Sequence, residues 1–170
     1  NSCYYYNTTN YDCDGNCIGT DCCLSQSDDC TVFDISGNGY STIIIGTQEW
    51  LQQNLKVAKY HNGDQIPSFY TNSEWTELST GAYSVYDDTP TNAETYGNLY
   101  NWYAVDDDRG LCPEGWHVPS DEEFTTLINY LGGLSNAGGK MKSTGTIEGG
   151  DGLWEEPNTG ATNESGFTAL

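Results

Sequence analysis

The chain offers few side chains with the chemistry of a catalytic centre. It has only two histidines, His61 and His117, and it lacks both the Gly-x-Ser-x-Gly sequence of serine hydrolases and the His-Glu-x-x-His sequence of zinc proteases. His117 lies between Trp116 and Val118, just before a predicted helix, which favours a structural histidine over a functional one. Carboxylates are abundant, but no two are set apart by their context as an acid–base pair. We therefore predict that the protein is not an enzyme.

Acidic side chains gather at two places that suit a calcium ion. Calcium binds several carboxylate and carbonyl oxygens, and we expect it to be the only cofactor. The candidate ligands are Asp12, Asp14 and Asn16 in one segment, and Asp106, Asp107 and Asp108 in another. The first segment lacks the EF-hand register, because its glycine comes one position early and no glutamate closes the loop. A turn between bridged cysteines and a solvated acidic loop are the alternatives, and the sequence leaves them open.

Aromatic side chains in predicted loops are the candidates for ligand binding. The chain contains 13 Tyr and 5 Trp, more than a small core needs. An aromatic face can stack on a sugar ring while nearby amides and carboxylates bond its hydroxyl groups. Trp75, Tyr86 and Trp154 lie in such loops, so we predict that they contact a glycan or a surface protein. The alternative for each is an ordinary core aromatic residue.

The cysteines predict a small cross-linked module at residues 1–30. Six of the seven lie there: Cys3, Cys13, Cys17, Cys22, Cys23 and Cys30. Such a density is typical of disulfide-stapled modules in exported proteins, and the segment has neither a histidine nor a pair of C-x-x-C knuckles for zinc. Cys112 is then the odd cysteine. We expect its partner to lie outside the chain or in a segment lost from it.

Composition and charge exclude several classes of partner. The 170 residues carry a net charge of −20, which repels phosphate, so nucleic acid and anionic bilayers are not expected as partners. The longest aliphatic run, Ile43-Ile44-Ile45, is far shorter than the roughly 20 residues of a membrane span, so no membrane insertion is expected. The start has neither a Met nor a signal-peptide pattern, which suggests a mature or trimmed product.

The elements that must position these side chains form an α+β domain over residues 31–170. Residues 32–34, 40–45 and 49–55 are predicted to form a short β-meander, with a hairpin turn at residues 36–39. Tyr96, Leu99, Tyr100 and Tyr103 follow helical spacing, which predicts a helix over residues 93–105. A second helix starts at the N-cap Ser120, with Glu123 in a capping box, and ends at Gly132-Gly133. Residues beyond 135 are predicted to be long loops.

Several long motifs resemble a known bacterial family. They are Asp34-x-x-Gly37-Asn38-x-Tyr40, Ile45-Gly46-x-Gln48-x-Trp50-Leu51-x-x-Asn54-Leu55, Asn62-Gly63-Asp64-x-Ile66-Pro67, Gly81-Ala82-Tyr83, residues 96–105, Leu111-Cys112-Pro113-x-Gly115-Trp116-His117-Val118-Pro119-Ser120-Asp121, residues 139–145, and Pro157-Asn158-x-Gly160-Ala161-Thr162-Asn163-x-Ser165-Gly166-Phe167. On these residues the chain resembles the Fibrobacter succinogenes major paralogous domain family over about residues 31–170.

The resemblance implies an exported domain of bacterial surface proteins and carries no established activity. Residues 115–124 are similar to the start of a helix in sulfatase-modifying-factor domains, which implies a C-type-lectin-like fold. The late cysteine pair of the formylglycine-generating relatives has no counterpart, so oxidase chemistry is not implied. Family members continue beyond the Gly-Phe-x-Ala-Leu motif to a late strand bearing a cysteine. We therefore expect a fragment with an open sheet edge, whose missing segment holds the partner of Cys112.

These observations together predict an extracellular or cell-surface module. We expect it to bind glycan or protein ligands through its loops. The alternative is a structural subunit of a surface filament or multidomain adhesin, in which a neighbouring copy fills the open edge.

Overall fold

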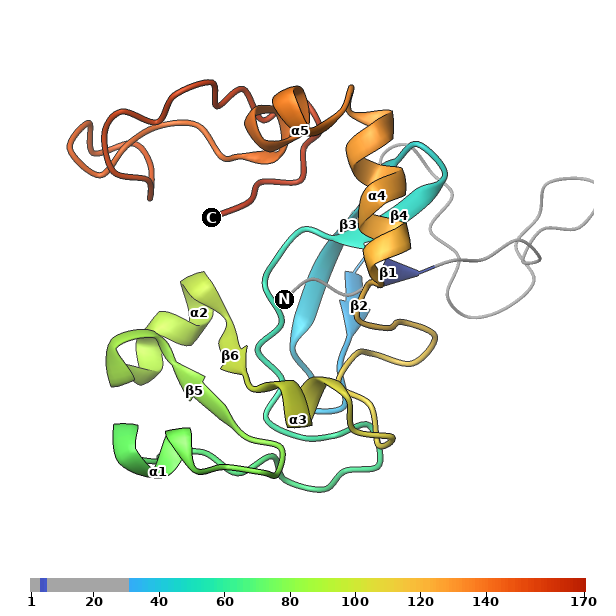
Figure 1. Cartoon of the computed structure of the whole chain (residues 1–170), viewed down its shortest axis with the longest axis vertical. Coiled ribbons are helices and arrows are strands. Elements are labelled where there is room, and N and C mark those ends of the chain that lie inside the picture. The colour runs from blue at the N-terminus through green and yellow to red at the C-terminus, as the bar shows by residue number, and fades with distance from the viewer. Residues whose placement is uncertain (1–3, 6–30) are drawn as a thin grey trace, which may run out of the picture.

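The computed structural model describes residues 4–5 and 31–170, and these form a mixed α+β structure with two small antiparallel sheets (Figure 1). The first sheet has the order β1 (Tyr4–Tyr5), β4 (Gln48–Leu51), β3 (Gly39–Ile45) and β2 (Thr31–Phe33). The second sheet pairs β5 (Tyr83–Val85) with β6 (Asn98–Tyr100). The helices of the described residues are α1 (Asn72–Thr76), α2 (Ala93–Tyr96), α3 (Trp102–Val105), α4 (Asp121–Tyr130) and α5 (Leu134–Met141), with 3-10 turns η1 (Tyr86–Asp88) and η2 (Pro90–Asn92).

The α+β class is thereby confirmed, although the described residues hold more helices than the two expected. The six cysteines predicted to form disulfides, and the predicted calcium ligands Asp12, Asp14 and Asn16, all lie outside the described residues. Within the described part of the chain, no helix combines the length and apolar character needed to cross a bilayer.

The predicted strands 32–34 and 40–45 form a hairpin, as β2 and β3. The buried carboxylate of Asp34 holds the turn, because it accepts hydrogen bonds from the backbone amides of Ser36 (2.8 Å) and Asn38 (3.0 Å) and from the Tyr40 hydroxyl (2.7 Å). Gly37 supplies the positive φ of +83° that the turn requires. The third predicted strand is shorter than expected, since β4 ends at Leu51 and the chain then leaves the sheet.

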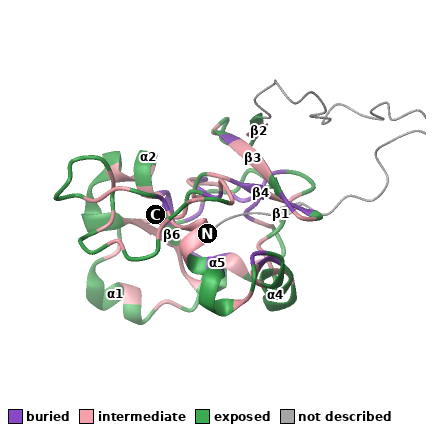
Figure 2. Cartoon of the chain, turned by 90° about the horizontal axis from the view of Figure 1, so that it is seen from above, coloured by how far each residue is buried: buried purple, intermediate pink, exposed green. Residues whose placement is uncertain are grey.

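The sheet separates two hydrophobic clusters. Successive side chains on a strand point to opposite faces. Trp50 therefore packs with Ile45, Leu127 and Leu131 on one face, while Leu51 packs on the other with Tyr40, Leu55, Val57, Tyr60 and Leu111. Figure 2 shows this burial along the sheet, with exposed helices around it.

The predicted helix over residues 93–105 is wrong. Instead, α2 ends at Tyr96, β6 follows, and α3 begins at Trp102. Gly97 interrupts the helix with φ 69° and ψ −166°, a conformation almost confined to glycine. Leu99 then pairs with Ser84 in the second sheet. The four residues with helical spacing therefore belong to three successive elements, which are α2, β6 and α3.

The predicted helix after Ser120 is confirmed as α4. The Ser120 side chain accepts a hydrogen bond from the Glu123 amide, and the Ser120 amide donates one to the Glu123 carboxylate. Gly132 and Gly133 end this segment with φ of +98° and +86°. The long loop predicted beyond residue 135 is partly wrong, because α5 occupies Leu134–Met141. Its Gly139 is needed for close packing, since an added Cβ there would lie 2.3 Å from the Gly160 carbonyl oxygen.

Candidate ligand-binding site

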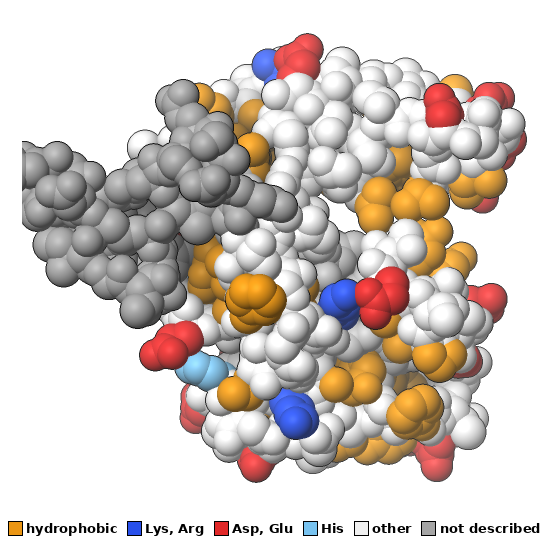
Figure 3. Space-filling model, turned by 180° about the vertical axis from the view of Figure 1, so that it is seen from behind, with side chains coloured by type: hydrophobic (Ala, Val, Ile, Leu, Met, Phe, Trp, Pro, Cys, Tyr) orange, Lys and Arg blue, Asp and Glu red, His pale blue; other side chains and the backbone are white. Residues whose placement is uncertain are grey.

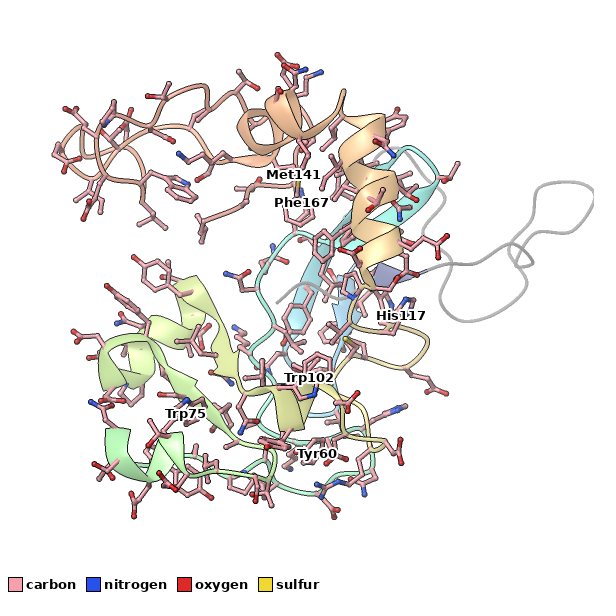
Figure 4. All side chains as sticks on the ribbon, in the orientation of Figure 1. Tyr60, Trp75, Trp102, His117, Met141 and Phe167 are labelled. Atoms are coloured by element: carbon pink, nitrogen blue, oxygen red, sulfur yellow. The ribbon has the colours of Figure 1, made fainter. Side chains whose placement is uncertain are left out.

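A hollow of about 440 Å³ lies between α3 and the segment that leads into α4. We call it the histidine hollow, because both histidines of the chain line it. Its lining also includes two tryptophans, a carboxylate and a hydroxyl, and the residues with these groups are His61, Trp102, Asp106, Trp116, His117 and Ser120. Figure 4 shows Trp102 and His117 between α3 and the first turn of α4, with Tyr60 below them.

The short helix α3 presents Trp102 at this hollow. Asn101 caps the helix, because its side-chain oxygen accepts hydrogen bonds from the amides of Ala104 and Ala82, each at 3.0 Å. The Asn101 amide group also donates to the Thr80 carbonyl at 2.9 Å. Ala104 is fully buried, whereas the side chain of Trp102 is 68% exposed. The capped helix α3 therefore holds the large aromatic side chain of Trp102 in solvent.

On the other side of the hollow, the capping box of α4 positions His117. Its Nε2 atom lies 2.9 Å from Glu123 Oε1. Partial burial raises the pKa of the Glu123 carboxyl, but the hydrogen bonds from the Ser120 backbone and from His117 outweigh it and lower the pKa overall. The ionised Glu123 thus fixes both the helix start and the ring of His117.

Arg109 anchors the loop below the hollow. Its guanidinium lies 3.8 Å from the centre of the Tyr60 ring and pairs with Asp107 at 2.8 Å and with Asp64 at 3.1 Å. The hydrogen bonds from the Arg109 side chain lower the pKa of Asp107 to about 2. The His61 amide donates to the Gly110 carbonyl at 2.9 Å, which ties His61 to this loop.

The predicted calcium ligands Asp106, Asp107 and Asp108 are not gathered around one point. The Asp107 carboxylate forms an ion pair with Arg109, and Asp106 lines the histidine hollow. Among residues 4–5 and 31–170, no three His, Cys, Asp or Glu side chains are grouped so that they would hold a metal ion. Figure 3 shows that acidic side chains spread over the surface, with few cationic ones among them.

The predicted ligand-binding aromatics lie elsewhere, and none of the three lines the histidine hollow. Trp154 is held internally, because its Nε1 donates to Ser143 Oγ (3.1 Å) and to the Ala169 carbonyl (3.2 Å). Trp75 is half-buried in α1, away from Trp102 (Figure 4). Tyr86 is 57% exposed in η1, beside the ring of Tyr96.

Sequence reasoning missed Trp102. The sequence held no signal for it, because its position depends on the contacts of Asn101 with Thr80 and Ala82, which are distant along the chain.

Cys112 also lines the histidine hollow and is buried. It takes part in a disulfide bond, whereas we expected its partner to lie outside the chain or in a segment lost from it.

A second, smaller hollow of about 220 Å³ lies beside β5, and we call it the Phe69 hollow. Phe69 is 92% exposed and has a φ of +65°, in the left-handed region that costs an ordinary residue about 1–2 kcal/mol. Asp88, on the same hollow, has a φ of +47°. The remaining lining comes mainly from Lys56, Ala58, Ser68, Tyr83, Ser84, Val85, Pro90 and Ala93.

The sequence profile of the Fibrobacter succinogenes major domain matches residues 43–170, which is more than half of the chain. The chain belongs to this family. Its description names neither a ligand nor a reaction. No curated protein and no solved structure matches the chain. Because the match runs from β3 to Leu170, both hollows lie within the Fibrobacter succinogenes major domain.

Proposed function

We propose that this Fibrobacter succinogenes major domain is an extracellular or cell-surface binding module that takes a glycan in the histidine hollow. The exposure of Trp102 on its anchored helix carries the proposal. Leaving a tryptophan in water forgoes the stabilisation of roughly 25 cal/mol per Å² that burial would provide. A sugar ring stacked on Trp102 would recover part of it.

The polar groups around Trp102 suit the hydroxyl groups of a sugar. Asp106 accepts hydrogen bonds and His61 both donates and accepts them, while Ser120 and His117 are held in place by Glu123. A volume of about 440 Å³ falls within the roughly 300–1,000 Å³ of small-ligand sites. No side chain of the hollow is assigned a catalytic role.

The proposed domain organisation is the one that the sequence predicts. We propose a cross-linked module at residues 1–30, followed by a C-type-lectin-like domain at residues 31–170. The small antiparallel sheets and the long segment after Met141 that forms no strand support the lectin-like part. Calcium bound by Asp12, Asp14 and Asn16 belongs to the same proposal.

A glycan array tests the proposed ligand. We expect the intact protein to bind a defined set of glycans and the Trp102→Ala variant to lose roughly tenfold or more in affinity for them. Trp75→Ala is the matched control and should bind as the unaltered protein does. A parallel array with a chelator shows whether calcium takes part. Absence of binding in both conditions would reject the glycan proposal.

A second candidate function is a subunit of a filament or adhesin that contacts copies of itself. One observation favours it. The strand β2 is at the edge of its sheet, and its neighbourhood exposes Phe33 (63%), Ile35 (50%) and Ile44 (69%). Size-exclusion chromatography and electron microscopy over a concentration series test it. A monomer at every concentration would remove this function.

A further inference from the structure

The Phe69 hollow is a separate site, because it shares no lining residue with the histidine hollow. Its walls are the strand β5, the turn η2 and the chain at Lys56 and Ala58. These elements hold together tightly. The Tyr83 amide donates to the Pro67 carbonyl at 3.0 Å, and the Asn98 amide donates to the Leu55 carbonyl at 2.9 Å. The hollow is therefore built on a fixed scaffold.

Phe69 is the feature of this hollow that the folded chain does not explain. A left-handed backbone suits glycine and is unfavourable for a bulky side chain. Such strain persists only where the surrounding structure holds the residue in place, yet the Phe69 ring is 92% exposed. Strain of this kind clusters at ligand sites, where the surroundings hold a residue ready for its partner. A bound partner would cover the ring.

The size and charge of the hollow indicate the partner. At about 220 Å³ the hollow is smaller than a typical small-ligand site and has room for one large side chain. Tyr83, Val85 and Pro90 give it apolar walls. The Lys56 ammonium forms an ion pair with Glu94. The Asp88 carboxylate also lines the hollow, and it takes part in none of the ion pairs of the described residues.

We propose that the Phe69 hollow docks one large apolar side chain of a partner protein, on a segment that carries Lys or Arg beside it. The apolar side chain would pack against Phe69 and the walls of β5, and the cation would pair with Asp88. The net charge of −20 attracts such a segment, and a second copy of this chain, with 5 basic residues against 25 acidic ones, is a poor source of it. The partner is therefore a different, basic protein.

Short peptides test this proposal with the full chain labelled with ¹⁵N. The probes are acetyl-Arg-Trp-Arg-amide, its Glu-flanked analogue and its Gly-centred analogue. We expect the first to shift the amide signals of Ser84, Val85 and Asp88, and to bind roughly tenfold more tightly than either analogue. No shift with the first peptide at millimolar concentration would overturn the proposal. Equal binding of the Glu-flanked peptide, or shifts at these amides from a sugar alone, would also overturn it.

Phe69→Gly separates binding from folding. Glycine accepts the left-handed backbone without strain, so we expect the melting temperature to stay within about 4 °C of the unaltered protein. Affinity for the first peptide should fall roughly tenfold or more. Phe33→Ser removes another exposed phenylalanine and should keep peptide affinity. Unchanged affinity in Phe69→Gly, or a large loss of stability, would contradict a docking role.

Trp102→Ala keeps this test independent of the proposed glycan site. That variant should bind the peptide normally, whereas Phe69→Gly should bind the glycan normally. Loss of both activities in either variant would overturn the separation of the two hollows.

Discussion

Trp50 and Trp102 are the same residue type in opposite situations. Trp50 is fully buried, and its ring lies 5.3 Å from that of Phe124 and 5.8 Å from that of Phe167. It thus joins β4, α4 and the last residues of the chain. Trp102 is 68% exposed on a helix that is held in place through Asn101 and Ala104.

The difference indicates which aromatic residues serve the fold and which are available for binding. The region around Trp50 gains its stability from apolar area removed from water. In the histidine hollow the anchoring groups beneath Trp102 are satisfied, while the ring above them is not covered. Removing a side chain should therefore affect stability in the first region and binding in the second.

The largest effect on stability is expected for Trp50→Ala. The substitution leaves a cavity between the sheet and α4, and the free energy of unfolding should fall by about 3–5 kcal/mol. Urea unfolding measures the loss. Trp102→Ala is the matched control, with an expected change of about 0.5 kcal/mol or less. A loss in Trp102→Ala as large as in Trp50→Ala would make Trp102 a core residue and end the comparison.

Gly97→Ala should have the next largest effect, about 2–3 kcal/mol of destabilisation. A Cβ at this position would lie 2.7 Å from the Leu55 carbonyl oxygen, and the positive φ adds strain. Gly63→Ala is the control, because Gly63 has a φ of +91° but no atom within 4 Å of the added Cβ. Thermal unfolding of both variants separates the clash from the strain. Equal losses would show that packing against Leu55 does not matter.

Ser120→Ala should cost about 1 kcal/mol, because it removes the hydroxyl that caps α4 at the edge of the histidine hollow. Ser135→Ala, within α5, should change stability far less. The two variants are compared by urea unfolding. If Ser120→Ala matches Ser135→Ala, the capping box does not stabilise the helix.

The smallest effect is expected at the Asp107–Arg109 pair, since exposed ion pairs contribute little. The folded pKa of Asp107, about 2, lies below its ordinary value of 3.8. Its contribution is therefore complete above about pH 4 and is lost as the pH falls toward 2. Asp107→Asn should differ from the unaltered protein at pH 5 and converge with it near pH 2. Asp108→Asn, outside this pair, is the control, and a constant difference at all pH values would contradict the assignment.

Sequence patterns correctly predicted those parts of the fold that depend on interactions between residues close together in the sequence. The capping box of α4 and the hairpin around Asp34 depend on contacts within about six residues, and both were predicted. The helix over residues 93–105 failed because side-chain spacing cannot reveal that Gly97 adopts a non-helical conformation. α5 was missed because Gly138-Gly139 suggests a loop, whereas Gly139 is required by its approach to Gly160.

The candidate site depends on contacts that are distant in sequence. Trp154 was predicted to be available for binding, but its hydrogen-bond partners lie 11 and 15 residues away. His117 was interpreted as a structural histidine and His61 was given no role, and only the tertiary structure brings them to one hollow. The exposure of Trp102 depends on Asn101 contacting Thr80 and Ala82. None of these contacts leaves a periodic pattern in the sequence from which it could be predicted.

The most direct test follows the indole N–H signals of the five tryptophans while the glycan that binds best is added. Substitution of each tryptophan by phenylalanine assigns the signals. We predict that Trp102 and Trp116, which line the histidine hollow, shift together with ligand occupancy, while Trp50, Trp75 and Trp154 stay in place. A shift of Trp75 or Trp154 with an unmoved Trp102 would contradict the account and place the ligand elsewhere on the domain.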